Sequence, residues 1–223
     1  RGYSPGARPT ELAAYRREEL SGDALALADE AGAERFHLVG HDWGGVLAWD
    51  IALHAPERVT SLTVLSTPHP TALGHALKTP DQLKKSWYIG MFQIPAAPER
   101  LLAGRVGTLT RRAGIPEEAA ERYERRFATA DDLRGPINWY RAMLRKDGVT
   151  GKNAGNGIIT MPTTFVWGNR DPALGRTAAE ETEVYVHAPY EFIELDAGHW
   201  LPEREAPAVA EAIVDRISSV TSD

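Results

Sequence analysis

The fold is decided at Gly40-His41-Asp42-Trp43-Gly44-Gly45, where an aspartate lies between glycines directly after the apolar residues 36–39. This spacing of small residues predicts a sharp turn from a strand into a helix, which lifts one reactive side chain above the edge of a sheet. The central residue is a carboxylic acid, which is already ionised at neutral pH and can attack a saturated carbon unaided. An aspartate between glycines is also common in ordinary turns, so the motif alone leaves a structural role open.

The flanking sequence supplies the context that such a turn requires. A helical pattern over residues 45–54 ends at Ala55-Pro56, and residues 10–32 predict the helix that precedes the turn. Apolar segments predict strands at residues 36–39, 59–65, 162–168 and 191–195. Strands that alternate with helices predict an α/β fold, with a mostly parallel sheet and helices on both of its faces.

Two further residues complete a catalytic set with Asp42. An ester formed on Asp42 must be hydrolysed, which requires a histidine to activate water and a second carboxylate to orient that histidine. Asp171 follows one predicted strand and His199 follows the last. Taken alone, Asp171 could be a turn residue and His199 a capping or core histidine. Their order after Asp42, each at the end of a strand, is that of the α/β-hydrolase fold, so we expect a nucleophile, an acid and a base.

The sequence resembles the epoxide hydrolase branch of the α/β-hydrolases. The elbow resembles that family, and so do four further segments: Trp167-Gly168-Asn169-Arg170-Asp171, Gly198-His199-Trp200-Leu201-Pro202-Glu203, Tyr88-Ile89-Gly90-Met91-Phe92-Gln93-Ile94-Pro95 and Asn138-Trp139-Tyr140-Arg141. The last two carry the family's two cap tyrosines, which fall here on Tyr88 and Tyr140. The resemblance implies an α/β-hydrolase with an inserted helical cap, which hydrolyses an epoxide to a vicinal diol without a cofactor.

The two tyrosines suit the chemistry that the resemblance implies. Opening an epoxide produces an alkoxide, which is a poor leaving group unless hydrogen-bond donors stabilise its charge. Phenols stay protonated at neutral pH, so Tyr88 and Tyr140 could donate to the ring oxygen, although either alone would more simply be a packed aromatic residue. The resemblance also implies that the Trp43 N–H is an oxyanion donor and that four aromatic side chains bind the substrate, namely those of Trp43, Phe92, Trp139 and Trp200.

An insertion interrupts the predicted sheet. Between the turn at Thr67-Pro68 and the strand at 162–168, helical patterns occupy residues 81–92, 98–113, 117–128 and 131–145. We therefore predict a partial core formed by residues 1–70 and 158–223, with a helical cap at residues 71–157. Gly151-Lys152 lacks the full spacing of a phosphate-binding loop, so no nucleotide is expected there.

Composition narrows the range of partners. The 223 residues carry a formal net charge of -6, which disfavours nucleic acid or an anionic membrane surface as the main partner. The absence of cysteine excludes disulfides and thiolate metal sites and suits a cytoplasmic setting, with an upstream targeting segment left open. No apolar run is long enough to span a bilayer. His37 and His41 lie on a strand and its turn, so no metal site is expected. The expected partners are a small apolar epoxide and water, and the oligomeric state is not predicted.

The first residues bear on the extent of the fold. Arg1-Gly2-Tyr3-Ser4 resembles the loop after the fourth strand of the family, which implies that the N-terminal strands and the His-Gly-x-Pro loop have no counterpart here. We therefore expect the sequence to be part of a longer hydrolase. That loop supplies the second oxyanion donor, and loss of one such donor costs about 3 kcal/mol of transition-state stabilisation. Ester hydrolysis is then expected to suffer more than ester formation.

Two other functions stay open at this point. A haloalkane dehalogenase would use the same aspartate nucleophile, with Trp43 holding the departing halide. The two tyrosines favour the epoxide, because a halide needs no proton. The other alternative is a truncated relic that is non-catalytic or reacts only once on Asp42. Halide release without diol formation would identify the first, and trapping of an epoxide without turnover would identify the second.

Overall fold

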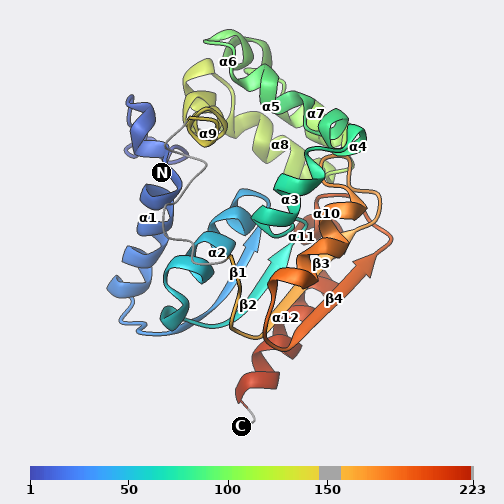
Figure 1. The fold of residues 1–223 in the computed structure, drawn as a ribbon. Coiled ribbons are helices and arrows are strands. Elements are labelled where there is room, and N and C mark those ends of the chain that lie inside the picture. Colours follow the sequence, from blue (N-terminus) through green and yellow to red (C-terminus); the bar gives the residue numbers. More distant parts are fainter. Residues whose placement is uncertain (146–156, 222–223) are drawn as a thin grey trace. The chain divides into compact units, whose positions relative to one another are not determined.

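The computed structural model describes residues 1–145 and 157–221, which form two compact units (Figure 1). The helical unit comprises Arg1–Asp23 and Trp87–Lys152, and the sheet unit comprises Ala24–Ser86 and Asn153–Asp223. Helix α1, Arg17–Glu30, begins in the helical unit and ends in the sheet unit. Gly151-Lys152, where no nucleotide is expected to bind, lies outside the described residues.

The described part of the sheet unit is built on four parallel strands in the order β1-β2-β3-β4. They are β1 (Phe36–His41), β2 (Val59–Leu65), β3 (Thr163–Gly168) and β4 (Tyr190–Leu195). In the register of the sheet, His41 lies opposite Leu65, Leu65 opposite Val166, and Gly168 opposite Leu195. The carboxyl ends of the strands therefore meet at one edge, where parallel α/β sheets place their reactive loops.

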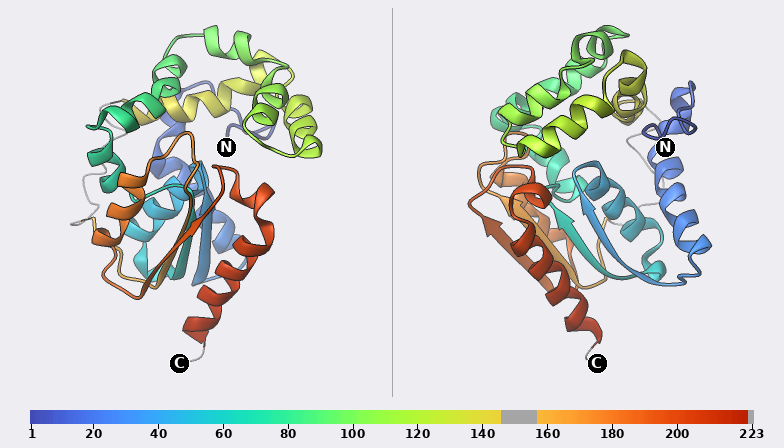
Figure 2. Two further views of the ribbon diagram at one scale, coloured as in Figure 1. Left: turned by 90° about the vertical axis from the view of Figure 1, so that its right-hand side faces the viewer. Right: turned by 180° about the vertical axis from the view of Figure 1, so that it is seen from behind.

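Helices cover both faces of this sheet (Figure 2). Helices α2 (Trp43–His54) and α10 (Arg176–Glu181) lie on one face, and α12 (Ala206–Thr221) lies on the other. Other helices of the unit are α3 (Pro70–Ala76), α4 (Pro80–Lys85) and α11 (Leu201–Arg204). The inner strand β3 is covered on both sides, and every one of its residues is buried, whereas β1 and β4 at the two ends of the strand order are partly exposed.

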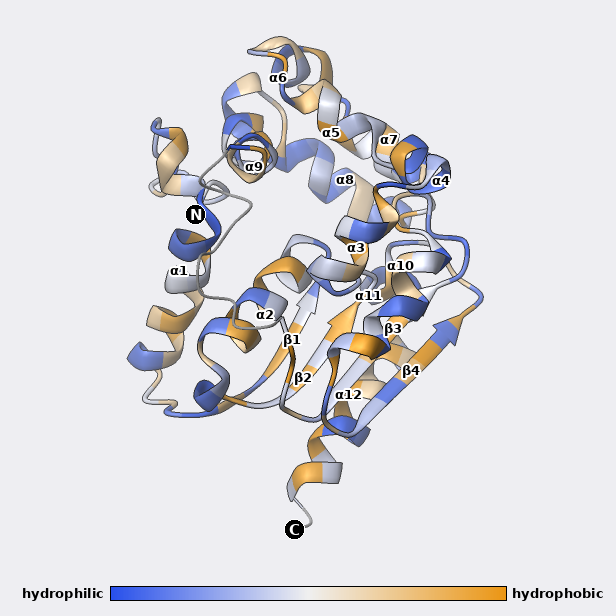
Figure 3. Cartoon of the chain, viewed as in Figure 1, coloured by the Kyte–Doolittle hydropathy of each residue, from blue (hydrophilic) through white to orange (hydrophobic). Residues whose placement is uncertain are grey.

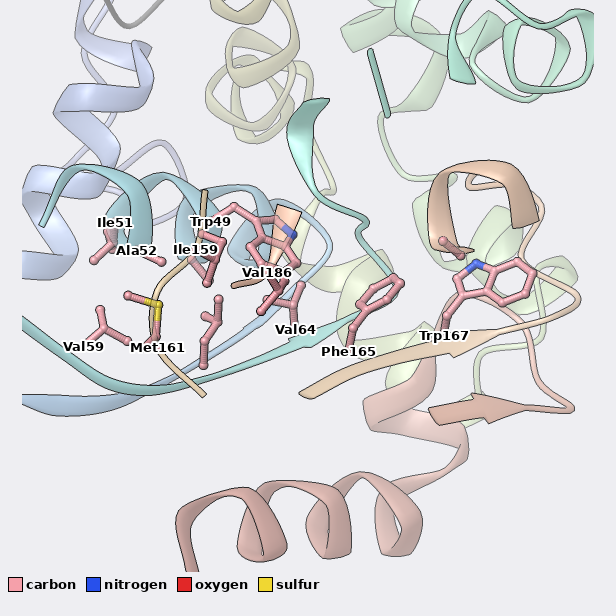
Figure 4. Close-up of a cluster of buried hydrophobic side chains, with 13 residues drawn as sticks. Trp49, Ile51, Ala52, Val59, Val64, Ile159, Met161, Phe165, Trp167 and Val186 are labelled. Atoms are coloured by element: carbon pink, nitrogen blue, oxygen red, sulfur yellow. The ribbon is translucent and has the colours of Figure 1, made fainter. Parts of the chain in front are cut away.

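The main core of the sheet unit lies between the strands and helix α2. Trp49 from α2 is fully buried there with Val64 of β2 and Phe165 of β3 (Figure 4). A second cluster joins Leu65 and Val166 to Val209 of α12 on the opposite face. Figure 3 shows hydrophobic residues on β2 and β3, whereas β4 carries hydrophilic residues as well. Burial of this apolar surface holds the strand ends in place and thus supports the loops that follow them.

The helical unit contains α5 (Trp87–Phe92), α6 (Ala97–Leu102), α7 (Val106–Arg112), α8 (Glu117–Arg126) and α9 (Ala130–Met143), together with a 3-10 helix at Leu12–Tyr15. Its first residues pack against α9. Trp139 Nε1–H donates to the carbonyl oxygen of Arg1 at 3.1 Å, and a side chain at Gly135 would collide with the backbone of Gly2. Arg141 forms a buried ion pair with Glu99, which ties α9 to α6.

The predicted α/β-hydrolase fold class is confirmed, and the four predicted strands are present. Two predicted helices are each divided in the structure. The pattern at 81–92 breaks at Ser86 between α4 and α5, and the pattern at 98–113 breaks near Gly104, which has a φ of 63°. Residues 10–32 form a 3-10 helix followed by α1. In the division into compact units, residues 1–23 belong with the helical insertion and residues 71–86 with the sheet. The predicted limits, a core at 1–70 and 158–223 and a cap at 71–157, describe where the chain is interrupted and stay a prediction.

Candidate active site

The turn that follows β1 has the geometry of a nucleophile elbow. Asp42 adopts φ 52° and ψ −121°, a backbone conformation that residues other than glycine rarely take, and helix α2 begins at the next residue. The glycines on either side allow this turn to be tight. A Cβ atom at Gly45 would lie 2.9 Å from Cβ of Thr67, and one at Gly40 would collide with the backbone of Gly44. The close approach of backbone segments therefore explains both glycines.

The elbow yields a prediction about stability. We expect Gly40→Ala to lower the free energy of unfolding by about 3 kcal/mol, because the added methyl group meets backbone that cannot move aside. Gly44→Ala is the matched control, since a Cβ at Gly44 has no atom within 4 Å. Urea denaturation followed by circular dichroism measures both variants. Equal midpoints for the two would contradict the tight elbow.

The structure brings Asp42, His199 and Asp171 into one hydrogen-bonded chain. His199 Nδ1 lies 2.7 Å from Asp171 Oδ2, and His199 Nε2 lies 3.2 Å from Asp42 Oδ1. The exposed fraction of the side chain is 41% for Asp42, 8% for His199 and 0% for Asp171. The carboxylate with access to solvent is therefore the one on the elbow, and the buried one is placed to orient the histidine.

The loop that carries Asp171 is held by hydrogen bonds of its own. Asp171 Oδ1 accepts from the backbone N–H groups of Ala173 and Leu174 at 2.7 and 3.0 Å. Gln82 of α4 donates to the carbonyl oxygen of Ala173 at 2.7 Å, and Lys85 Nζ donates to that of Asp171 at 2.8 Å. Sequence reasoning missed Gln82 and Lys85, because their only local signal is membership of a helical pattern.

The three groups shift one another's pKa values. Burial by itself lowers the pKa of His199, but the hydrogen bonds and negative charges of Asp171 and Asp42 outweigh it and raise that pKa to about 10. Desolvation acts to raise the pKa of Asp42, yet the hydrogen bond and charge of His199, with the N–H of Trp43, hold it below its usual range. At neutral pH His199 is therefore protonated in the resting site and Asp42 is ionised.

His41 lies beside this chain and was not predicted to be part of it. Its Nε2 is 2.9 Å from the carbonyl oxygen of His199, and the two imidazole rings are 5.0 Å apart between centroids. Burial and the charge of His199 lower the pKa of His41, so its ring is neutral at pH 7. Because a carbonyl oxygen only accepts, Nε2 of His41 carries the hydrogen.

Tyr88 and Tyr140 lie together in the helical unit. Their rings, from α5 and α9, are 5.8 Å apart in an edge-to-face arrangement, and the ring of Phe92 is 4.8 Å from that of Tyr140. Gln93 Nε2–H bonds to the carbonyl oxygens of Ile89 and Tyr140, both at 3.1 Å, which joins α5 to α9. The structure thus clusters the two tyrosines with Phe92 inside one unit.

The remaining predicted aromatic residues have different surroundings. Trp43 is buried at the start of α2, and Trp200 lies with its ring 5.4 Å from that of His199. Trp139 is buried in the helical unit, where its indole packs edge-to-face on Tyr3 and bonds to Arg1. The proposed contact of these residues with a substrate stays a prediction.

Two structural findings bear on metals and membranes. Within residues 1–145 and 157–221, no group of three or more His, Cys, Asp or Glu side chains is placed to hold a metal ion. None of the helices in the described part of the chain is long and apolar enough to cross a membrane.

Comparison with known proteins agrees with the fold. A family model described as alpha/beta hydrolase fold matches residues 1–206. The AB hydrolase superfamily protein YfhM of Bacillus subtilis is 32% identical over 96% of this chain and 76% of its own length. Epoxide hydrolase A of Mycobacterium tuberculosis is 30% identical over 99% of this chain and 80% of its own. The crystal structure of Epoxide Hydrolase A from Mycobacterium thermoresistibile has a TM-score of 0.81 and 30% identity, covering 98% of this chain and 80% of that one.

Proposed function

This chain belongs to the α/β-hydrolase fold family, in its epoxide hydrolase branch, and we propose that it opens a small apolar epoxide to a vicinal diol without a cofactor. The observation that carries the proposal is the hydrogen-bonded chain from an elbow carboxylate through His199 to Asp171. A carboxylate at the elbow suits attack on a saturated carbon, because it needs no base to remove a proton first.

The first proposed step forms an ester on Asp42. A carboxylate oxygen of Asp42 bonds to an epoxide carbon, the ring C–O bond breaks, and its electron pair stays on the ring oxygen. Tyr88 or Tyr140 gives that oxygen a proton, and the tyrosinate is reprotonated from solvent. The imidazolium of His199 favours this step, since it keeps Asp42 ionised and ready to attack.

The second proposed step hydrolyses the ester. Once Asp42 is esterified, its negative charge is gone, so one of the two charges that hold the proton on His199 is lost and the pKa of His199 falls. His199 then releases that proton to solvent and removes one from water, and the resulting hydroxide attacks the ester carbonyl carbon. The Trp43 N–H donates to the oxyanion of the tetrahedral intermediate. The bond between the acyl carbon and the alkyl oxygen then breaks, and the hydroxyl proton of the intermediate passes to that oxygen. The diol leaves, and Asp42 is again a carboxylate beside protonated His199.

This sequence of charges predicts how each step depends on pH. We expect ester formation to be independent of pH above about pH 5, where Asp42 is ionised. Ester hydrolysis should instead accelerate as pH rises, because the neutral form of His199 is the base. The pKa of His199 is about 10 when Asp42 is charged. In the ester that charge is gone, so the rate should reach its plateau at a pH below about 10. Rapid-quench mass spectrometry across pH 5 to 10 separates the steps. A hydrolysis rate that falls with rising pH would exclude His199 as the base.

The two tyrosines should act on the first step. We expect Tyr88→Phe and Tyr140→Phe each to slow ester formation about 100-fold, because each removes one donor to the alkoxide while keeping the ring that packs with Phe92. The double variant should be slower still. Tyr123→Phe is the control, since Tyr123 stacks on Phe127 elsewhere in the same unit. Stopped-flow or rapid-quench measurement of the ester tests this, and equal rates in all variants would remove the tyrosines from the mechanism.

A single turnover in water labelled with heavy oxygen tests the whole proposal. Hydrolysis at the ester carbonyl carbon places the water oxygen on Asp42 and the unlabelled Asp42 oxygen in the first diol, so peptide mass spectrometry should find the label on Asp42. Label in the first diol would mean direct attack of water. Halide release from a haloalkane with no diol formed from an epoxide would favour the dehalogenase, for which Trp43 beside Asp42 is the supporting observation.

A further inference from the structure

Two adjacent hydroxyl groups at the end of β2 reach the main chain of two residues in the proposed triad. Ser66 Oγ–H donates to the carbonyl oxygen of His199 at 2.8 Å, and Thr67 Oγ1–H donates to that of Asp42 at 2.9 Å. Ser66 and Thr67 lie within one short corner, while Asp42 and His199 are far apart in sequence. This Ser66-Thr67 corner is therefore a common support for both.

The Ser66-Thr67 corner is itself fixed. Ser66 and Thr67 are both buried, and Ser66 adopts a φ of 66°, which a residue other than glycine rarely takes. The backbone N–H of Ser66 bonds to Val166 on β3 at 2.8 Å, and Trp49 Nε1–H bonds to the carbonyl oxygen of Thr67 at 2.9 Å. The sheet thus holds the backbone of Ser66, α2 holds that of Thr67, and the hydroxyl of Ser66 bonds to the loop of His199.

The other donors to the same two carbonyl oxygens are mostly local. Val46 N–H bonds to Asp42 within the first turn of α2, and Leu201 N–H bonds to His199 within its own loop. Such local bonds shape the turn but cannot hold it against the sheet. Thr67 ties the elbow to β2, and Ser66, together with His41 Nε2, ties the His199 loop to the sheet.

We propose that Ser66 and Thr67 are positioning residues, which fix the main chain of Asp42 and His199 from one corner and so set the separation of nucleophile and base. This inference rests on the proposed function. It assigns the two hydroxyls to different steps. Thr67 supports the residue that forms the ester, and Ser66 supports the residue that activates water.

The assignment predicts a kinetic split between two variants. Thr67→Val, which keeps the shape of the side chain, should slow ester formation about tenfold with a smaller effect on hydrolysis. Ser66→Ala should slow ester hydrolysis about tenfold, so that the ester accumulates, with a smaller effect on its formation. Thr67→Ser should restore the first rate. Rapid-quench mass spectrometry of the full chain with styrene oxide follows the ester as it forms and as it disappears. The rate of hydrolysis is expressed relative to the amount of ester formed.

Matched controls separate positioning from general stability. Ser61→Ala removes a buried hydroxyl of the same strand that bonds to His37, and Thr163→Val removes one that bonds to Met161, both away from the triad. We expect both controls to keep wild-type rates for each step. Ser66→Gly provides a second route if Ser66→Ala folds poorly, because glycine accepts the positive φ and still lacks the hydroxyl. It should show the same slow hydrolysis.

The outcomes of this experiment are distinct. Slowing of both steps by the same factor in Ser66→Ala and Thr67→Val, or rates equal to those of the controls, would overturn the inference. If the wild-type chain forms no ester with the epoxide at all, the proposed function fails instead. A wild-type chain that forms and hydrolyses the ester, with the two variants defective in different steps, supports both.

Discussion

Replacement of Asp42 by alanine is expected to abolish diol formation, with kcat/KM falling by at least about 10⁴-fold. Asp42 is the carboxylate of the proposed triad with solvent access, whereas the side chain of Asp171 has no exposed surface and cannot replace it. Asp42→Ala should also form no covalent adduct when incubated with an epoxide. Diol production measured by chromatography and intact-protein mass spectrometry report the two results.

An exposed carboxylate near the site provides the control for Asp42. Asp196 precedes the His199 loop, has a side chain that is 76% exposed, and forms an ion pair with Arg170 at the surface. Asp196→Ala should therefore keep wild-type activity, since exposed ion pairs contribute little. Retention of diol formation by Asp42→Ala, with unchanged kcat/KM, would mean that another group or water itself attacks the epoxide.

Replacement of His199 by glutamine is expected to stop the reaction at the ester. Glutamine can still donate to Asp171, but it cannot take a proton from water, so hydrolysis should slow about 10³-fold. Ester formation should continue at a reduced rate, because Asp42 loses its cationic partner. Each molecule of His199→Gln should then retain one equivalent of alkyl group, measured by intact-protein mass spectrometry after a rapid quench.

The exposed His187 provides the matched control for this variant. His187→Gln should hydrolyse its ester at the wild-type rate and accumulate no adduct. If His199→Gln turned over at the wild-type rate, another base would have to activate water. If it formed no ester at all, His199 would act chiefly by keeping Asp42 ionised, and the order of the two steps proposed above would need revision.

The elbow and the strands were predictable because their signals are local. Two glycines around an aspartate, directly after an apolar segment, encode a strand, a turn and a helix within a few residues, and the structure has β1, the Asp42 turn and α2 there. Asp171 and His199 were predictable from their position after strands, since parallel strands bring their carboxyl ends together. Their roles are those of the proposal, while their proximity is a finding of the structure.

The supports of these residues were not predictable from local pattern. Gln82 meets the Asp171 loop, and Ser66 meets His199, across long stretches of chain. A serine at the end of a strand looks like any turn residue, because nothing in the sequence indicates which distant carbonyl oxygen its hydroxyl will find. Helix breaks were equally hidden, since the pattern at 98–113 stays helical on both sides of Gly104 and only the positive φ interrupts it.

The difference in exposure among Asp42, His199 and Asp171 limits where His199 can exchange a proton. Both oxygens of Asp171 are occupied, one by His199 and the other by two backbone N–H groups, and its side chain is sealed from water. A proton can therefore enter or leave the histidine only through Nε2, on the side of Asp42. The hydrogen-bonded row of Asp171, His199 and Asp42 thus exchanges protons at one end only, and any group attached to Asp42 lies at that end. Esterification of Asp42, as the proposed mechanism requires, would thus change the proton exchange of His199 with solvent, and the imidazole would then report each turnover.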